Sequence, residues 1–243
     1  MLSLFFTAGF PELDSLGKTL RSLQENGIDF AEIGMPFSDP LADGPVIQQT
    51  NTVAIRNGMN LELLFRQLEG MQMEMPLILM GYLNPVLQFG VESFCRRAAG
   101  AGVSGVILPD LPPDVYEAQY RDLFLSYGLH FVFLITPTTD EARIRKIDAL
   151  STAFIYAVSS SSITGKQGAD EGRKRDYLLR LQKMDLVHPL MVGFGVQDKA
   201  SFALAREFTA GAIIGTAFLN ARMEAGDEDQ AVKTLLRKLN GKP

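Results

Sequence analysis

Eight short apolar runs recur along the 243-residue chain, each rich in β-branched or aromatic residues and ended by Gly, Pro, Asp or Ser. Between them lie segments whose apolar residues repeat with the helical period of about 3.6 residues. The eight predicted strands are residues 3–9, 30–34, 76–82, 105–110, 130–136, 153–159, 189–195 and 211–217. Strands that alternate with helices pair in parallel through helical crossovers, so eight such units predict an α/β protein with a closed (β/α)8 TIM barrel.

An open, doubly wound sheet is the alternative arrangement for alternating strands and helices. Its usual phosphate fingerprint is absent, because the first strand-to-helix turn reads Thr7-Ala8-Gly9-Phe10-Pro11 and not GxGxxG. No linker, low-complexity tract or change of composition divides the chain. We therefore expect a single barrel domain over residues 1–243.

The composition argues against several classes of protein. A formal net charge of -5 without basic clusters argues against nucleic acid and anionic membranes as partners, and no apolar stretch approaches the roughly 20 residues that cross a bilayer. One cysteine allows no internal disulfide framework, so we expect a reducing compartment and a cytoplasmic protein. Two histidines and one cysteine, with no HxH, HExxH or CxxC motif, predict no metal site.

A carboxylate interrupts the second predicted strand, FAEIG. Phe30, Glu32 and Gly34 share one face of this strand, and Ala31 and Ile33 share the other. If Ile33 packs outward, Glu32 points into the barrel among apolar neighbours, and burial then raises its pKa. Such a carboxyl group can both give and take a proton. The alternative is a structural salt bridge, but no predicted strand carries an obvious Lys or Arg partner.

An acidic, proline-rich loop follows this strand, PFSDPLADGP. It holds Asp39 and Asp43, and its prolines restrict the backbone that carries them over the barrel mouth. Asp43 could cap a helix or form an Asx-turn, and Asp39, before a proline, could equally be a turn residue. The spacing alone does not tell which aspartate reacts.

A phosphate site is predicted near the end of the chain. The seventh strand ends with Gly193-Phe194-Gly195, and the eighth ends with Gly215-Thr216, followed by what could be one turn of helix. Barrels often bind phosphate with these two loops and a short helix N-terminus, where backbone amides approach the oxygens. Thr164-Gly165, in the long loop after the sixth strand, could close over the same phosphate. The alternative is that these glycines only form tight turns.

With these segments identified, the chain resembles the tryptophan synthase alpha subunit family over nearly its whole length. The most specific match is EIGMPFSDPLADGP, residues 32–45, and the others are Thr7–Gly9, Met80–Pro85, Pro109–Pro112, Gly193–Gly195 and Gly215–Thr216. The resemblance implies cleavage of indole-3-glycerol phosphate to indole and glyceraldehyde 3-phosphate, without metal or coenzyme. It also implies a pyridoxal-phosphate-dependent beta subunit as the partner in an α2β2 complex, with the pyridoxal phosphate only in that partner.

The resemblance further implies roles for individual residues. Glu32 matches the catalytic acid/base, and Asp43 matches a second catalytic carboxylate. The expected substrate-binding residues are Phe5, Ile47, Tyr82 and Tyr156, and the expected phosphate-binding residues are Gly165, Gly193, Gly195, Gly215 and Thr216.

Two features depart from the family pattern. Residues 159–162 are four serines where many relatives carry an arginine, so closure of this loop is expected to differ. The sequence also begins at the first predicted strand, without the short helix that usually covers the bottom of the barrel.

Two other functions fit a phosphate-binding barrel. A sugar-phosphate aldolase or isomerase would need a Schiff-base lysine or a metal cluster at the strand ends, and no predicted strand contains a lysine. A non-catalytic barrel that only binds a phosphorylated ligand would not need both Glu32 and Asp43.

Overall fold

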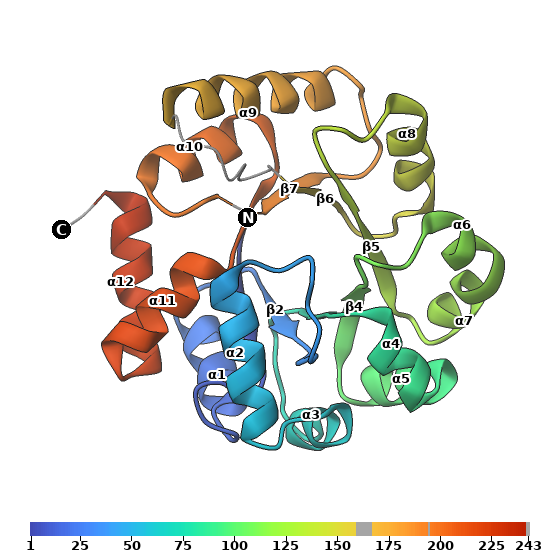
Figure 1. Cartoon of the computed structure of the whole chain (residues 1–243), viewed down its shortest axis with the longest axis vertical. Coiled ribbons are helices and arrows are strands. Elements are labelled where there is room, and N and C mark those ends of the chain that lie inside the picture. Colours follow the sequence, from blue (N-terminus) through green and yellow to red (C-terminus); the bar gives the residue numbers. More distant parts are fainter. Residues whose placement is uncertain (159–166, 194, 242–243) are drawn as a thin grey trace.

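A closed barrel of eight parallel strands forms the centre of the computed structural model, which describes residues 1–158, 167–193 and 195–241 (Figure 1). Each strand pairs with the next, and the last pairs with the first, in the order β1 to β8. The strands are β1 (Leu2–Thr7), β2 (Phe30–Gly34), β3 (Leu77–Met80), β4 (Val103–Ile107), β5 (His130–Ile135), β6 (Ile155–Val158), β7 (Leu190–Gly193) and β8 (Gly211–Ile214). The predicted barrel and all eight predicted strands are confirmed.

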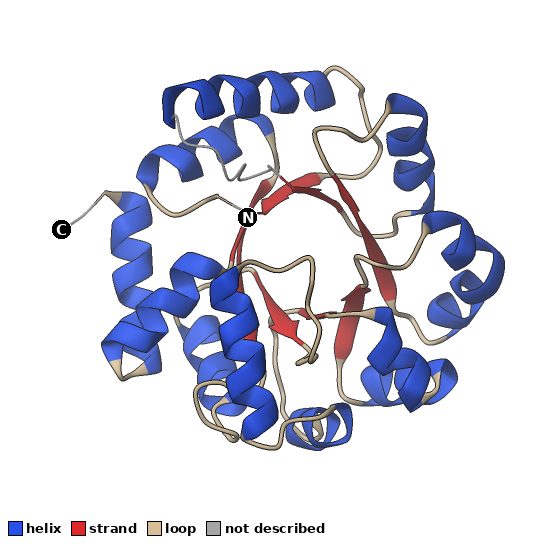
Figure 2. Cartoon of the chain, in the orientation of Figure 1, coloured by secondary structure: helices blue, strands red, loops and turns tan. Residues whose placement is uncertain are grey.

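The helices form a ring outside the strands (Figure 2). They are α1 (Leu16–Glu25), α2 (Pro45–Arg56), α3 (Leu61–Leu68), α4 (Leu83–Phe89), α5 (Val91–Gly100), α6 (Pro113–Val115), the π-helical turn η1 (Tyr116–Tyr120), α7 (Arg121–Ser126), α8 (Glu141–Leu150), α9 (Gln167–Gln182), α10 (Lys199–Phe208), α11 (Thr216–Ala225) and α12 (Glu228–Asn240). Because helices cover the outside and side chains fill the inside, both faces of the strands are buried, which explains their nearly continuous apolar sequences.

Short polar side chains fix where several outer helices begin. Asn60 accepts a hydrogen bond from the amide of Leu63 at the start of α3, and Asp140 does the same for the amide of Arg143 at the start of α8. Before α10, Asp198 and Ser201 form a reciprocal capping box. These oxygens satisfy amide groups that have no partner inside the helix, so each helix starts at a defined residue.

A buried arginine connects α11 to the loop between β1 and α1. The Arg222 guanidinium, 1% exposed, pairs with Glu228 and donates to the carbonyl of Phe10 and to the hydroxyl of Thr19. The guanidinium also lies 5.5–5.8 Å from the ring centroids of Phe6, Phe10 and Phe218. This cluster joins α11 and the start of α12 to the β1–α1 loop, which places the N-terminus of α11 at the mouth of the barrel.

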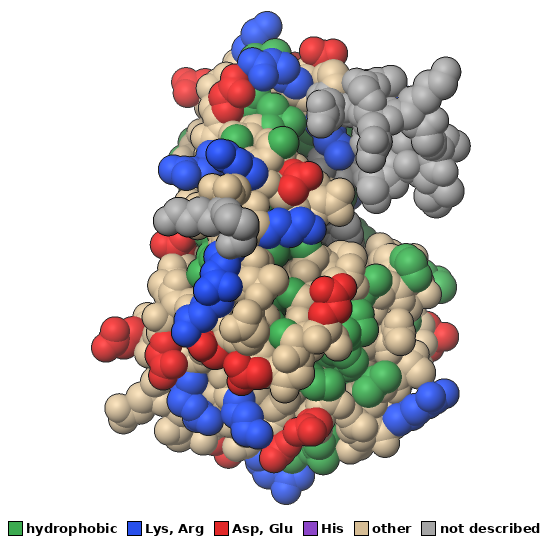
Figure 3. Space-filling view, turned by 90° about the vertical axis from the view of Figure 1, so that its left-hand side faces the viewer, with side chains coloured by type: hydrophobic (Ala, Val, Ile, Leu, Met, Phe, Trp, Pro, Cys, Tyr) green, Lys and Arg blue, Asp and Glu red, His purple; other side chains and the backbone are tan. Residues whose placement is uncertain are grey.

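The surface carries both signs of charge. On the face shown in Figure 3, acidic and basic side chains are interspersed, with apolar side chains between them. Over the described part of the chain, no helix is both long and apolar enough to cross a membrane.

Candidate active site

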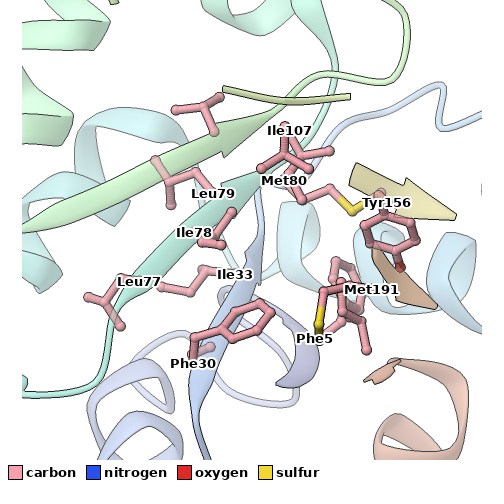
Figure 4. Close-up of a cluster of buried hydrophobic side chains, with 14 of the residues drawn as sticks. Phe5, Phe30, Ile33, Leu77, Ile78, Leu79, Met80, Ile107, Tyr156 and Met191 are labelled. Carbon is pink, nitrogen blue, oxygen red and sulfur yellow. The ribbon is translucent and has the colours of Figure 1, made fainter. Parts of the chain in front are cut away.

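Glu32 lies in the middle of β2, inside the barrel. It pairs in register with Phe5 of β1 and with Ile78 of β3, and both neighbours are buried. Side chains of residues paired across parallel strands point to the same face, so Glu32 is flanked by hydrocarbon on each side. Figure 4 shows the apolar cluster around this position, with Phe30 and Ile33 on opposite faces of β2.

The Glu32 carboxyl group is fully buried, and neither of its oxygens has a hydrogen-bond partner among the described residues. Burial raises its pKa from 4.5 to about 8, and the nearby charge of Asp43 adds to the increase. The predicted raised pKa is therefore confirmed. At neutral pH the group is mostly the uncharged acid. An apolar site that offers its oxygens no hydrogen-bond donor favours this neutral form over the carboxylate.

Asp43 lies in the β2–α2 loop, at the mouth of the barrel. Gly44, and not Asp43, is the N-cap residue of α2, with no side-chain capping bond. One carboxylate oxygen of Asp43 instead accepts a hydrogen bond from the Tyr82 hydroxyl, at 3.2 Å. Burial raises the pKa of Asp43 to about 6, and the Tyr82 hydrogen bond acts in the opposite direction. Asp43 is therefore mostly ionised at pH 7, beside a neutral Glu32.

The structure separates the two aspartates of this loop. Asp39 is exposed, its carbonyl accepts the amide hydrogen of Leu41, and its carboxylate accepts the hydroxyl of the neighbouring Ser38. It is thus a turn residue that faces solvent. Asp43 is half-buried and influences the pKa of Glu32, so it is the aspartate that shares an electrostatic environment with the buried acid.

Tyr156 projects from β6 into the barrel interior (Figure 4). Burial raises the pKa of its phenol, and the charges of Glu32 and Asp43 contribute, which places these three groups close to one another. Gly193 of β7 provides the space for the ring, because a Cβ atom on this glycine would come within 2.1 Å of the Tyr156 hydroxyl oxygen. Gly193 thus has a packing reason to be glycine, separate from its predicted contact with phosphate.

The other expected pocket residues surround the same region. Phe5 lies between two glycines, since a Cβ atom on Gly34 or Gly215 would meet its ring at 2.7 Å and 3.2 Å respectively. Ile47 is buried in the first turn of α2, directly after the loop that carries Asp43. Tyr82 reaches the site from the β3–α4 loop. Phe5 therefore links the Glu32 position to the end of β8, where phosphate binding is predicted.

The predicted phosphate residues lie on two neighbouring strand ends. Gly195 follows β7 with a positive φ of 77°, a conformation that favours glycine. Gly215 is the N-cap residue of α11, and Thr216 begins this helix with an exposed side chain. The helix extends over ten residues to Ala225, longer than the single turn considered from the sequence. Gly165 and the serines at 159–162 lie outside the described residues.

Sequence reasoning missed the groups that hold α2 over the barrel mouth. The Thr7 hydroxyl at the end of β1 lies 2.7 Å from the Thr50 hydroxyl of α2, and both side chains are buried. The side-chain oxygen of Asn51 accepts the amide hydrogen of Phe37 at 3.0 Å. The available signal was weak: Thr50 and Asn51 are polar residues at positions where the helical period of α2 places its buried face.

The histidines and the cysteine lie away from this pocket. His188 precedes β7 at the opposite end of the barrel, beside a surface cavity of about 370 Å³, and its ring contacts Asp148. His130 begins β5 at the same end, and Cys95 is buried on α5. Among the described residues, no group of three or more His, Cys, Asp or Glu side chains could hold a metal ion.

The arrangement defines the chemistry available to the pocket. It holds a neutral carboxylic acid in an apolar interior, an ionised carboxylate at the mouth, and a helix N-terminus two strands away. An acid tuned near pH 8 can protonate a weakly basic atom, and an ionised carboxylate can stabilise positive charge that develops on the same molecule. The helix N-terminus suits an anionic group at the other end of that molecule.

Comparisons with known proteins identify the family of the chain. A family model described as tryptophan synthase alpha chain matches residues 2–242. The tryptophan synthase alpha chain of Christiangramia forsetii is 49% identical over 228 residues, which is 93% of this chain and 89% of the relative. That of Bacteroides fragilis is 46% identical over 242 residues, 99% of this chain and 92% of the relative.

Solved structures give the same result. The crystal structure of tryptophan synthase subunit alpha from Legionella pneumophila superposes with a TM-score of 0.88 at 33% identity, covering 99% of this chain and 91% of that chain. A chain of the tryptophan synthase complex from Pyrococcus furiosus superposes with a TM-score of 0.86 at 29% identity, covering 99% and 97%.

Proposed function

The chain belongs to the tryptophan synthase alpha chain family, and from that premise we propose that Glu32 and Asp43 carry out its reaction, the cleavage of indole-3-glycerol phosphate to indole and glyceraldehyde 3-phosphate. The observation that supports these roles is the unequal pair of carboxyl groups. Glu32 is fully buried with two unpartnered oxygens, and Asp43 is half-buried and hydrogen-bonded to Tyr82.

The reaction is a retro-aldol cleavage, so one proton must be added and another removed. Carbon 3 of the indole ring gains a proton before its bond to the side chain can break. The neutral Glu32 acid supplies this proton, and its pKa of about 8 keeps it protonated at neutral pH. The new C–H bond uses the π electrons of the indole C2–C3 double bond, and Glu32 is left as a carboxylate.

The second half returns the proton to Glu32. The side-chain hydroxyl on the carbon next to C3 loses its proton to the Glu32 carboxylate and becomes the aldehyde oxygen. The electrons of the broken carbon–carbon bond restore the aromatic indole. No proton is gained or lost overall, which fits one carboxyl group that acts first as acid and then as base.

Asp43 stabilises the intermediate charge. Protonation of carbon 3 places positive charge on the indole nitrogen, and the ionised Asp43 accepts the hydrogen bond of that N–H group. Because the charge exists only after protonation, this interaction is stronger in the transition state than in the bound substrate. Phe5, Ile47, Tyr82 and Tyr156 form the indole pocket, and Gly165, Gly193, Gly195, Gly215 and Thr216 bind the phosphate.

The partner of the chain in this proposal is the beta subunit of tryptophan synthase, which receives the indole in an α2β2 complex. Pyridoxal phosphate is assigned to that subunit only. Leu41 supports a docking surface on the mouth side, because its side chain is 89% exposed at the tip of the loop that carries Asp43, and Leu87 of α4 is 47% exposed. We place the chain in the cytoplasm, acting as one domain over residues 1–243.

The test is an indole-release assay on purified chain with indole-3-glycerol phosphate, with and without a beta subunit. Glu32→Gln should reduce turnover by at least roughly a thousandfold and leave substrate binding, measured by calorimetry, within about threefold. Asp43→Asn should reduce turnover by roughly a hundredfold. Turnover that survives in Glu32→Gln would refute the acid/base role, and a chain that binds but never releases indole would be the non-catalytic barrel.

A further inference from the structure

Three successive loops at the barrel mouth are joined by hydrogen bonds that end at Asp43. The carboxylate of Asp110, after β4, accepts the amide hydrogen of Leu83 with both oxygens, at 2.9 and 3.1 Å. Leu83 is the first residue of α4, and its neighbour Tyr82 donates its hydroxyl to Asp43 at 3.2 Å. The same Tyr82 oxygen accepts the amide hydrogen of Ala42 at 3.0 Å.

The ring of Tyr82 is held as well as its hydroxyl. It packs against Phe37, with ring centroids 5.3 Å apart and the planes tilted by 35°. Phe37 is itself fixed, because its amide donates to the side-chain oxygen of the buried Asn51 on α2. The phenol therefore meets Asp43 from a direction set by both flanking loops, and a side chain that only lined an apolar pocket would not need these polar contacts.

We propose that Tyr82 is a positioning residue for Asp43 and that Asp110 positions Tyr82, so that the β4 and β3 loops together orient the carboxylate that faces the indole nitrogen. The inference rests on the proposed role of Asp43. The Tyr82 hydroxyl binds one carboxylate oxygen of Asp43 and the backbone amide of Ala42, which precedes Asp43. These two contacts fix the direction in which the other carboxylate oxygen points. Asp110 fixes the backbone at Leu83 and thereby the starting point of the Tyr82 side chain.

The hydrogen bond also acts on the charge of Asp43. A donor to a carboxylate stabilises its ionised form, and Tyr82 lowers the pKa of Asp43 against the effect of burial. The other titratable groups that act here are Glu32 from β2 and Tyr156 from β6, while Asp110 acts on Tyr82. Tyr82 donates its hydroxyl to Asp43 and carries no carboxyl group, so its loss would move the acid side of the activity profile while both carboxyl groups stay in place.

The first experiment is the pH dependence of kcat/KM for indole release by Tyr82→Phe. Wild type should lose activity as the pH falls through about 6, because Asp43 becomes protonated. In the variant this limb should move up by about one pH unit, so that kcat/KM falls roughly fivefold at pH 6 and recovers at pH 8. The matched control is Tyr127→Phe, a half-buried tyrosine at the end of α7, which should keep the wild-type profile.

The second experiment tests the contribution of Asp110. Asp110→Ala should move the same limb in the same direction by less than Tyr82→Phe, with kcat/KM at pH 6 reduced roughly threefold. In the double variant, Asp110→Ala should add nothing to Tyr82→Phe, because its effect passes through the missing hydroxyl. Asp122→Asn, an exposed acid in the first turn of α7, is the matched control.

The outcomes distinguish this inference from the proposed function. If Asp43→Asn is inactive but Tyr82→Phe keeps the wild-type acid limb, the positioning role is wrong. If Asp110→Ala lowers activity by the same factor in both backgrounds, the Asp110 step is wrong. If Asp43→Asn itself keeps full turnover, the proposed role of Asp43 fails instead. Should Tyr82→Phe not fold, 3-fluorotyrosine at position 82, a stronger donor, must move the limb to lower pH, and an unmoved limb overturns the inference.

Discussion

Glu32 and Asp148 are both buried acids, but they differ in their hydrogen bonds and in their roles. Asp148 of α8, 8% exposed, accepts the amide hydrogens of Val187 and His188 at 2.8 and 2.9 Å, and its oxygen lies 3.1 Å from the His188 ring. Glu32 is 0% exposed and has no such partner among the described residues. Asp148 therefore holds the segment before β7 in place. Glu32 lies among apolar side chains, and its oxygens accept no hydrogen bond from the described residues.

The difference shows how a buried carboxyl group reveals its role. A partnered acid satisfies the backbone of a neighbouring loop and contributes to stability. An unpartnered acid has a free-energy cost, and a fold keeps such a group where its reactivity is used. Burial alone does not separate the two roles, because both side chains are buried. The pattern of hydrogen bonds separates them.

The largest expected effect concerns stability and pH. The pKa of Glu32 in the folded chain is about 8, above its ordinary value of 4.5, so the folded state binds this proton more tightly than the unfolded state does. The stability that this proton gives is complete below about pH 4.5 and is lost as the pH rises through 8. Glu32→Gln lacks this loss and should be more stable than wild type at pH 9, by up to roughly 5 kcal/mol. Urea unfolding at pH 6 and pH 9 measures it, and equal pH dependence in both proteins would contradict it.

Next in size is the alkaline limb of activity. Above pH 8, ionisation of Glu32 removes the acid that protonates the indole, so kcat/KM should fall roughly tenfold per pH unit and about a hundredfold by pH 10. Asp148→Asn should keep the midpoint of this limb, since Asp148 lies at the other end of the barrel. A shifted midpoint in Asp148→Asn would show that Asp148 also influences the reacting acid, and would contradict its purely structural role.

A smaller effect is expected from removing the partnered acid. Asp148→Ala leaves the amides of Val187 and His188 without their acceptor, and it should lower the free energy of unfolding by about 2 kcal/mol. Indole release at 25 °C should stay within about twofold of wild type. Denaturant titration and steady-state kinetics on the same preparation check both parts, and the opposite pattern, lost turnover with intact stability, would move Asp148 into the functional class.

The smallest effect is expected for an exposed acid. Asp39 lies four residues before Asp43 in the same loop but faces solvent. Asp39→Asn in the isolated chain should therefore change indole release by less than about twofold, whereas Asp43→Asn should lose far more. A large loss in Asp39→Asn without any beta subunit present would show that the exposed acid of this loop takes part in the chemistry.

The strands and the buried acid could be predicted from the sequence, because the residue types in each segment reflect how deeply that segment is buried. A strand covered on both faces is apolar at every position, and the FAEIG run has the predicted bounds of β2. The charge in that run is conspicuous, so Glu32 could be selected before its neighbours were known. Burial, the largest cause of its raised pKa, was enough to predict the direction of the shift, to which the charge of Asp43 adds.

The support of Asp43 was not readable, because it depends on residues distant in the sequence. Tyr82 lies 39 residues from Asp43, and the sequence suggested it only as a pocket wall. The spacing did not separate Asp39 from Asp43 either, since both sit in turn-forming contexts. The length of α11 was underestimated because its apolar residues serve two surfaces, the barrel and α12, and leave little periodicity to detect.

The register that places Phe5 and Ile78 on either side of Glu32 has an evolutionary consequence. The hydrocarbon that flanks the proposed indole site is the same hydrocarbon that raises the pKa of the acid. A descendant that replaced Phe5 with a smaller residue to admit a bulkier substrate would also let water reach the carboxyl group, and the proton would be released at lower pH. A substitution on these strands thus changes the substrate range and the pKa of Glu32 at the same time. Substitutions in the loops can change specificity without changing that pKa.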